Sequence, residues 1–226
     1  MTPSAVLFDL DGTLLDTPTL ILECLEVVCS ERDHPLDWKQ ARTLIGKPLD
    51  VIFPLLLPQS DQRSLDDAKE LFRSEFSRLS IPRAAAIVFP GIREILDLLK
   101  EQGHPLGVVT SKITSSAQEL LEASDLADYF SVVVGHDMAS KGKPAPDLAL
   151  LAARDLDVVP QDTVVVGDSS DDIRMAIAAG MRSVGVGWGI GTEVALLQAG
   201  ASAIAPSVDS LREILSSLQL EEKETV

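Results

Sequence analysis

The chain has 226 residues, of which 46% are of hydrophobic types, enough for one packed domain with a smaller insertion. Its 19 basic and 35 acidic residues give a net charge of −16 at pH 7, which argues against a nucleic-acid partner because phosphate backbones bind basic surfaces. The sequence holds no run of 18 apolar residues and residues 1–4 show no signal-peptide pattern, so we expect a cytoplasmic protein without a membrane partner.

Two aspartates follow the first predicted strand. Residues 5–8 form a short apolar run of strand length, and Asp9 and Asp11 come just after it, where the chain turns at Gly12. At an effective dielectric of about 20, two full negative charges ~4 Å apart repel by about 4 kcal/mol. The pair therefore predicts a divalent cation with oxygen ligands or a shared proton, although a polar turn explains the stretch equally well when it is taken alone.

The next stretch of the sequence is predicted to be all helical. Apolar residues recur at helical spacing, and the predicted helices cover residues 17–31, 38–44, 49–57 and 61–79. No strand is expected between residues 17 and 82, so this stretch predicts a helical insertion, with connections near residues 16–18 and 81–90. Cys24 and Cys29 lie about 140° apart around the first of these helices and are expected to stay reduced.

From residue 90 onward, predicted strands and helices alternate. The strands are nearly continuous runs of Val, Ile and Leu, expected over residues 105–109, 131–134, 163–166, 182–186 and 201–205. Such runs are typical of a parallel sheet that is covered on both faces. The sequence therefore predicts an α/β fold, a Rossmann-like parallel sheet with helices on both faces and an inserted helical domain. The charged tail, residues 221–226, is expected to fray.

Polar side chains gather where the predicted strands end. Ligands of open parallel α/β sheets bind beyond the carboxyl ends of the strands. The residues expected at this edge are Asp9, Asp11, Thr110, Ser111, Lys143, Asp168 and Asp172. Each has a plain structural explanation by itself; Asp172, for instance, suits the first turn of a helix. Together, however, they favour a site: carboxylates suit Mg²⁺, and a metal ion with a lysine, a hydroxyl and the N–H groups of a tight turn suits a phosphoryl group.

These motifs resemble, in order, the four motifs of the haloacid dehalogenase (HAD) superfamily. The matching stretches are Asp9-x-Asp11-Gly12-Thr13, Val109-Thr110-Ser111, Lys143-Pro144 and Gly167-Asp168-x-x-x-Asp172. The helical insertion and the stretch Phe89-Pro90-Gly91 resemble the branch of the superfamily that contains phosphoglycolate phosphatase, which has a small helical cap. The resemblance implies a catalytic core over residues 1–16 and 83–226 and a cap over residues 17–82.

The resemblance also implies a role for each motif residue. Asp9 would be the nucleophile that takes the phosphoryl group, and Asp11 would protonate the leaving oxygen and then activate water. Asp9, Asp11 through its backbone carbonyl, and Asp168 would hold Mg²⁺, with support from Asp172. Lys143 and Thr110, with Ser111 beside it, would bind the phosphoryl oxygens. The implied protein is a Mg²⁺-dependent phosphatase for small phosphorylated metabolites, most similar to phosphoglycolate phosphatase.

Several alternatives remain open at this point. On the same fold, the chain could be a phosphomutase similar to β-phosphoglucomutase, or a pyrophosphatase. A non-catalytic phosphate-responsive binding protein is a further alternative, but it would leave Asp11 without a task. Lys47, on the turn at residues 45–48, and Arg42 are the candidate cap residues for substrate contact, although a solvated lysine explains the turn equally well. A monomer or a homodimer is expected. Lys112 is interpreted as a rim residue, and His136 as structural or solvated.

Overall fold

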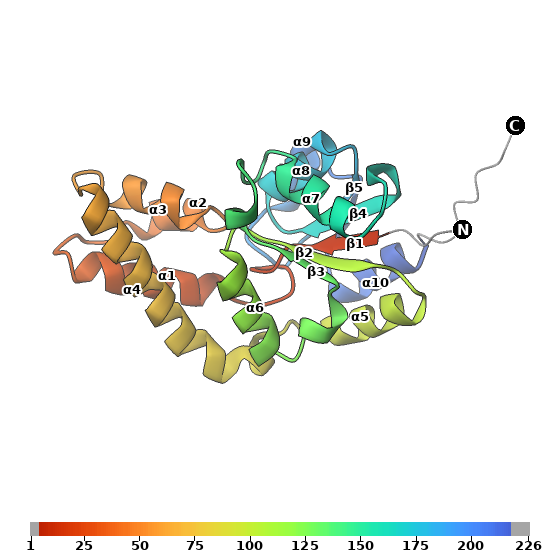
Figure 1. Cartoon of the computed structure of the whole chain (residues 1–226), viewed down its shortest axis with the longest axis horizontal. Helices are drawn as coiled ribbons and strands as arrows, with labels where there is room; N and C mark the ends of the chain where they lie inside the picture. The colour runs from red at the N-terminus through yellow and green to blue at the C-terminus, as the bar shows by residue number, and fades with distance from the viewer. Residues whose placement is uncertain (1–4, 218–226) are drawn as a thin grey trace, which may run out of the picture.

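Six parallel strands form one sheet in the computed structural model, which describes residues 5–217 (Figure 1). Their order across the sheet is β3-β2-β1-β4-β5-β6. The strands are β1 (Ala5–Phe8), β2 (Leu106–Val109), β3 (Val132–Val134), β4 (Thr163–Gly167), β5 (Arg182–Val186) and β6 (Ala203–Ala205). All six predicted strands are present, and the predicted fold class, a Rossmann-like α/β sheet, is confirmed. The predicted fraying of residues 221–226 lies outside the described residues.

Helices cover both faces of this sheet (Figure 1). They are α5 (Ile92–Glu101), α6 (Thr114–Ala123), α7 (Asp147–Asp155), α8 (Ser170–Ala178), α9 (Glu193–Ala199) and α10 (Val208–Ser216). Short 3₁₀ turns, η2 (Ala127–Tyr129), η3 (His136–Met138) and η4 (Pro160–Asp162), join some of them to the strands. Figure 1 shows α7, α8 and α9 above the sheet and α5 and α10 below it.

Alternate residues of β1 face the two layers. Leu7 packs in one hydrophobic cluster with residues of α7 and α8, whereas Val6 and Phe8 belong to the other cluster, with residues of α5, α6 and α10. Because successive strand residues point to opposite faces, a four-residue strand with no polar residue is what a doubly covered sheet requires. All four residues of β1 are fully buried. This fixes the end of β1, and therefore the position of Asp9, firmly in the core.

Four helices fill the stretch between β1 and α5. They are α1 (Pro18–Ser30), α2 (Trp38–Leu44), α3 (Leu49–Leu56) and α4 (Gln62–Ser80), followed by the 3₁₀ helix η1 (Ile81–Ile87). Asp37 and Asp61 accept backbone N–H groups and so cap α2 and α4. The rings of Phe53, Phe72 and Phe76 pack in series between α3 and α4. The sequence predicted this helical stretch, but it did not predict η1, which begins at Ile81-Pro82.

The two connections of the helical stretch run side by side. Asp16 N donates to Ile87 O at 2.7 Å, and Phe89 N donates to Leu14 O at 3.1 Å. One hydrophobic cluster continues from the lower face of the sheet into α1 and α4, so the helices and the sheet share packing. The division into a core (1–16 and 83–226) and a cap (17–82) therefore stays a prediction. Within residues 5–217, no helix is long and apolar enough to cross a membrane.

The chain order reverses at β1. The strand pairs with β2 on one side and with β4 on the other, so the chain leaves β1 toward β2 and β3 and later returns to form β4, β5 and β6. In open α/β sheets, the crevice at such a reversal is where ligands bind. The residues that follow β1 and β4, Asp9 and Asp168, stand at this point.

Candidate active site

Three buried carboxylates and one buried ammonium group meet at the ends of β1 and β4. Lys143 Nζ lies 2.5 Å from Asp9 Oδ1 and 2.6 Å from Asp172 Oδ1. Carboxylate oxygens of Asp9, Asp168 and Asp172 all lie within 4.8 Å of one another. The four residues come from three separate segments, with Asp168 and Asp172 on the same one, and each is at most 8% exposed. The sequence therefore predicted correctly that these residues meet at one edge of the sheet.

The cluster carries more negative charge than its lysine can balance. Burial, the strongest influence, raises the pKa of Asp9 well above its usual value, and the carboxylates of Asp172 and Asp168 raise it further, against the lowering effect of Lys143. Burial and Asp172 likewise raise the pKa of Asp168 to about 7. Burial alone would lower the pKa of Lys143, but Asp172 and Asp9 outweigh it and raise that pKa. Such shifts are what like charges without a sufficient counter-charge produce.

A divalent cation fits this cluster. Three ionised carboxylates and one ammonium group leave two negative charges (3 − 1 = 2) within a buried site. The ligand atoms are all oxygens, which suits a hard cation such as Mg²⁺ and not a metal that prefers thiolate or imidazole. Asp9, Asp168 and Asp172 are the side chains that would hold it. The carboxylate of Asp11 is not part of the cluster, so Asp11 could contribute only its backbone carbonyl, as the resemblance implied.

Local structure fixes each member of the cluster. Asp168 Oδ2 accepts the N–H of Ile190 at 2.8 Å, and Asp168 Oδ1 lies 3.5 Å from Thr13 Oγ1. Asp172 forms a capping box at the start of α8, where Oδ2 accepts from Ser169 N at 3.0 Å and from Ser169 Oγ at 2.5 Å. Asp172 is therefore both an acidic residue of the first turn of α8, as one explanation proposed, and a member of the cluster.

Gly12 lets the turn after β1 approach Asp168. Its φ of +82° lies in the left-handed region, and a Cβ at this position would lie 2.3 Å from Asp168 Oδ2. A side chain at position 12 would therefore be strained in backbone conformation and would collide with a cluster carboxylate. The turn that brings Asp11 back over the end of β1 depends on this glycine.

Asp11 lies in a different environment from Asp9. Its Oδ1 accepts the hydroxyl of Thr17 at 2.5 Å, and its Oδ2 lies 3.1 Å from Lys112 Nζ. Lys112 Nζ also lies 3.8 Å from the centroid of the Phe76 ring, which belongs to α4. Lys112 is therefore more than the rim residue that the sequence suggested, because it connects Asp11 to the helical stretch.

The predicted phosphate-binding hydroxyls lie at the end of β2. Thr110 is 1% exposed, and its Oγ1 accepts the N–H of Lys112 at 3.2 Å. The hydroxyl of Ser111 is buried and has no hydrogen-bond partner among residues 5–217. A buried polar atom without a partner needs an explanation, and a bound anionic oxygen would supply one.

The two candidate cap residues have different surroundings. Lys47 forms an ion pair with Asp171, on the first turn of α8, and thereby joins the turn after α2 to the catalytic edge of the sheet. Lys47 also lines the cleft described below. Arg42 is exposed on α2 and does not line this cleft. The structure thus brings Lys47 to the site and leaves Arg42 outside it.

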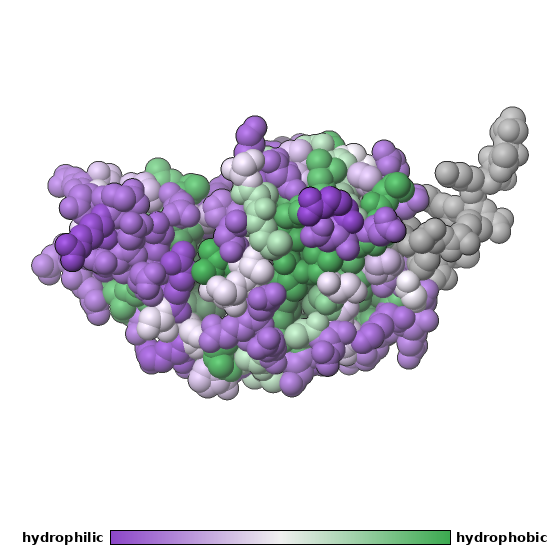
Figure 2. All heavy atoms as spheres, viewed as in Figure 1, coloured by the Kyte–Doolittle hydropathy of each residue, from purple (hydrophilic) through white to green (hydrophobic). Residues whose placement is uncertain are grey.

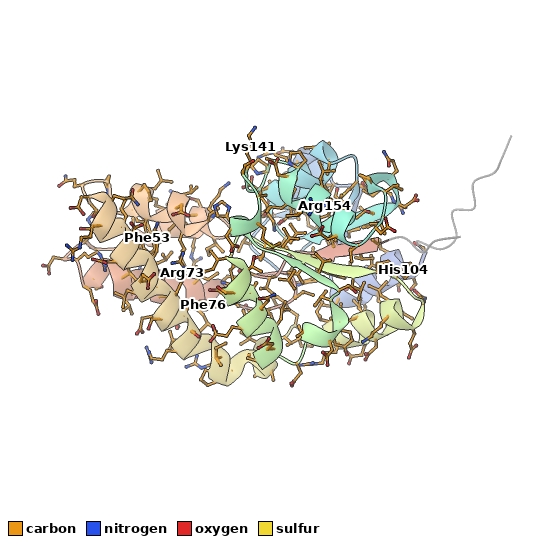
Figure 3. All side chains as sticks on the ribbon, viewed as in Figure 1. Phe53, Arg73, Phe76, His104, Lys141 and Arg154 are labelled. Carbon is orange, nitrogen blue, oxygen red and sulfur yellow. The ribbon has the colours of Figure 1, made fainter. Side chains whose placement is uncertain are left out.

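A cleft extends from Asp11 between the sheet and the helical stretch. Its cavity volume is about 70 Å³. One wall consists of α4 and the turn that carries Lys47, and the other consists of the start of α6. Figure 3 shows Phe53, Arg73 and Phe76 together at the helical end of the molecule, with His104 at the opposite end. A substrate that reaches Asp9 therefore has room beside Asp11.

Sequence reasoning missed several contacts at the site. The N–H of Ile190 belongs to the Gly-rich stretch after β5, and Gly191 N donates to Asp168 O at 3.0 Å. The glycines at 187, 189 and 191 at a strand end are the signal that could have indicated this loop. Trp188 in the same loop donates Nε1 to Thr13 O at 3.2 Å and packs edge-on against Phe89, so it supports the loop.

The raised pKa values predict that Mg²⁺ stabilises the protein more strongly at higher pH. A carboxyl group with a raised folded-state pKa binds its proton more tightly in the folded than in the unfolded chain. The metal-free protein therefore loses stability as the pH rises from about 4, the ordinary value for an aspartate, to about 7, the value for Asp168. A cation binds only the ionised carboxylates, so binding releases protons.

We expect millimolar Mg²⁺ to raise the melting temperature little at pH 5 and by about 5 °C or more at pH 8. Differential scanning calorimetry at four pH values, with and without Mg²⁺, measures this difference. The Asp168→Asn variant is the control, because it removes one titrating ligand and should reduce the pH dependence. A Mg²⁺ effect that is equal at pH 5 and pH 8 would contradict the metal assignment.

Comparisons with known proteins agree with the geometry of the site. A family model described as haloacid dehalogenase-like hydrolase matches residues 6–186. A protein of Dickeya dadantii (strain 3937), named probable phosphatase IndB, is 40% identical over 215 residues, 94% of this chain and 92% of the relative. Phosphoglycolate phosphatase of Escherichia coli (strain K12) is 32% identical over 240 residues, 97% of this chain and 95% of the relative.

Solved structures show the same architecture. A predicted phosphatase from Clostridium acetobutylicum has a TM-score of 0.82 at 30% identity, covering 96% of this chain and 100% of that one. A β-phosphoglucomutase from Clostridium difficile has a TM-score of 0.84 at 22% identity, covering 96% of this chain and 98% of that one. At 22% identity, the second likeness is evidence for the fold alone.

Proposed function

The chain belongs to the haloacid dehalogenase-like hydrolase family and is a phosphatase, and we propose that it hydrolyses small phosphorylated metabolites with Mg²⁺ through an aspartyl-phosphate at Asp9. One observation carries the proposal. Asp9 and Asp11 are two residues apart, yet Asp9 lies in the buried cluster with Lys143, whereas Asp11 lies at the cleft, paired with Lys112 and Thr17. Two carboxylates in different environments suit two different chemical roles.

In the first step, the Asp9 carboxylate attacks the phosphorus atom and the bond from phosphorus to the alcohol oxygen breaks. Asp11 donates its proton to that oxygen as the alcohol leaves into the cleft. In the second step, water attacks the phosphorus atom of the aspartyl-phosphate, Asp11 takes the proton of the water, and inorganic phosphate leaves with the Asp9 carboxylate restored.

The other residues of the site bind charge. Lys143, with Thr110 and Ser111, is positioned to neutralise and hydrogen-bond the phosphoryl oxygens. Mg²⁺ held by Asp9, Asp168 and Asp172 would add positive charge where the transferred group carries negative charge. This local positive charge explains how a chain with a net charge of −16 can act on an anion.

Metal removal tests the proposal directly. We expect dialysis against a chelator to abolish hydrolysis of p-nitrophenyl phosphate and Mg²⁺ to restore it, whereas Ca²⁺, which takes more ligands at longer distances, restores less. Activity that persists after chelation would contradict Mg²⁺ dependence. The relatives make phosphoglycolate the first metabolite to test. The phosphomutase and pyrophosphatase alternatives are tested by a coupled assay with a sugar bisphosphate and by pyrophosphate turnover.

The non-catalytic binding alternative is set aside, because the family and its named relatives are phosphatases. The proposed setting is cytoplasmic, with a small metabolite as the partner of the site. A monomer or a homodimer stays a prediction.

Lys47 and Arg42 provide a matched test of substrate contact. We expect Lys47→Gln to lower kcat/KM by about 10-fold, because the variant loses both a cation that lines the cleft and the ion pair with Asp171. Arg42→Gln should stay within about twofold of the wild type, because Arg42 is exposed and outside the cleft lining. Steady-state kinetics on one substrate measures both. Equal losses in the two variants would show that Lys47 has no specific role in the cleft.

A further inference from the structure

The walls of the cleft beside Asp11 are mainly apolar. The helical stretch contributes Phe72, Phe76 and the isoleucines at positions 21, 52 and 81, and the sheet side contributes Ile113 and Leu120. Phe72 and Phe76 stack on each other with a centroid distance of 6.0 Å. Figure 2 shows a largely hydrophilic surface over the helical stretch, and Phe72 and Phe76 of α4 are buried, so these two rings lie on the inner side of α4. An apolar wall beside a reaction centre suits a substrate with an apolar part.

The charges of the cleft lining balance one another. Its basic side chains, other than His136, are Lys47, Arg73 and Lys112, and its acidic ones are Asp11, Asp50 and Glu119, which gives 3 − 3 = 0. All three cations also have carboxylate partners, since Lys112 pairs with Asp11, Lys47 pairs with Asp171 and Arg73 pairs with Glu70. A second anionic group on the substrate, such as the carboxylate of phosphoglycolate, therefore finds no surplus of positive charge in this cleft.

The lining also holds polar atoms that the protein leaves without partners. The hydroxyls of Ser80 and Ser111 and the Nδ1 atom of His136 are buried, and none of them has a hydrogen-bond partner within the described part of the chain. All three residues line the cleft, and Ser80 is fully buried. Native proteins leave few buried polar atoms unpaired. The two walls of the cleft therefore do not supply hydrogen-bond partners for all of each other's buried polar atoms. These unpaired atoms are a second indication of a ligand.

Asp11 determines which part of the substrate enters the cleft. In the proposed reaction Asp11 protonates the leaving oxygen, and Asp11 is itself part of the lining. The alcohol attached to that oxygen must therefore extend along the walls formed by α4 and α6. We propose that the substrate is a phosphate monoester whose alcohol carries an apolar ring of aromatic size, bound between Phe72 and Phe76 on one side and Ile113 and Leu120 on the other. This inference rests on the proposed function and narrows its substrate class.

A pair of simple esters tests the ring. The alcohols of 2-phenylethyl phosphate and ethyl phosphate have similar acidity and differ in the phenyl group. We expect kcat/KM to be higher for 2-phenylethyl phosphate by about 10-fold or more, the discrimination that an apolar pocket gives for even a small apolar group. We also expect 2-phenylethyl phosphate to be preferred over phosphoglycolate. Equal values for the two simple esters, or a preference for phosphoglycolate, would overturn the inference.

Two neighbouring serines of α6 locate the ring. Ser116 lines the cleft, whereas Ser115 is exposed and does not. We expect Ser116→Trp, which fills the cleft, to reduce the ratio of kcat/KM for 2-phenylethyl phosphate to kcat/KM for ethyl phosphate to about 1. Ser115→Trp should keep the wild-type ratio. Thermal melting checks the fold of each variant, and Ser116→Leu is a smaller replacement if the tryptophan lowers the melting temperature. The same preference in the two tryptophan variants would show that the ring does not bind in this cleft.

The Asp9→Asn variant separates the two levels of the proposal. One outcome is that only the wild type hydrolyses ethyl phosphate, and that it shows no preference for the ester with the ring. In that case the substrate inference fails and the phosphatase mechanism stands. If the wild type is no faster than Asp9→Asn on any of the esters, the proposed function itself fails.

Discussion

Replacement of Asp9 by asparagine is expected to lower kcat by about 10⁴-fold or more, on every ester that the wild type hydrolyses. Loss of a nucleophile is among the largest single-residue effects in enzymes, and a carboxamide cannot form the aspartyl-phosphate. The fold should survive, because the variant removes a carboxylate whose pKa is raised by burial and then by repulsion from Asp172 and Asp168. Lys143 keeps Asp172 as its partner at 2.6 Å. The melting temperature of the metal-free variant should therefore equal or exceed that of the wild type.

The measurement combines turnover with detection of the intermediate. Rapid quenching in acid followed by mass spectrometry should find a phosphoryl group on Asp9 in the wild type and on no residue in Asp9→Asn. Asp16→Asn is the matched control, because Asp16 is exposed on the same segment and should keep activity within about twofold. Turnover of Asp9→Asn at the wild-type rate, confirmed with Asp9→Ala, would show that Asp9 is not the nucleophile.

The sequence predicted the cluster because parallel strands impose a simple rule. The carboxyl ends of β1 and β4 lie on the same edge of the sheet, so Asp9 and Asp168 had to come close together once both segments were recognised as buried strands. The order of the strands adds the reversal at β1, which places both residues in one crevice. The periodicity of the chain and the polar residues after each strand were sufficient to place these residues at one edge of the sheet, whereas the direct pairing of β1 with β4 is known from the structure.

The partners of Asp11 and Lys47 could not be predicted in the same way. Whether Lys112 meets Asp11 depends on how α6 and the turn before it sit against the sheet, and no local pattern fixes that arrangement. Lys47 was a candidate for substrate contact or a solvated lysine, but in the structure it meets Asp171 of the protein. The contact joins positions that are 124 residues apart, so it results from the packing of the helical stretch onto the sheet.

The cleft lining shows a third limit of sequence reasoning. The apolar stripe of α4, which includes Phe72 and Phe76, predicted a helix with a buried face. The same pattern serves a packed core and a substrate-binding wall, since both require apolar side chains at helical spacing. Only the position of this face opposite Ile113, beside Asp11, distinguishes the two. The sequence alone therefore does not distinguish a packed core from a substrate-binding wall on this helix.

Replacement of Asp11 by asparagine is expected to affect the two chemical steps differently. An alkoxide is a poor leaving group and needs the proton of Asp11, whereas p-nitrophenolate leaves without one. For ethyl phosphate, the variant should therefore lose about 10²- to 10⁴-fold in the formation of the aspartyl-phosphate. For p-nitrophenyl phosphate, that step should be much less affected. Release of phosphate should be slow with either substrate, because Asp11 no longer takes the proton from the attacking water.

Stopped-flow kinetics with p-nitrophenyl phosphate distinguishes these steps. We expect Asp11→Asn to release one equivalent of p-nitrophenol per active site in a rapid burst and then to turn over slowly, with the aspartyl-phosphate trapped on Asp9. Asp16→Asn, which changes an exposed aspartate five residues later, should show wild-type kinetics. If Asp11→Asn loses the same factor with both esters and shows no burst, Asp11 does not handle the proton. The ion pair with Lys112 would then only connect Asp11 to the helical stretch.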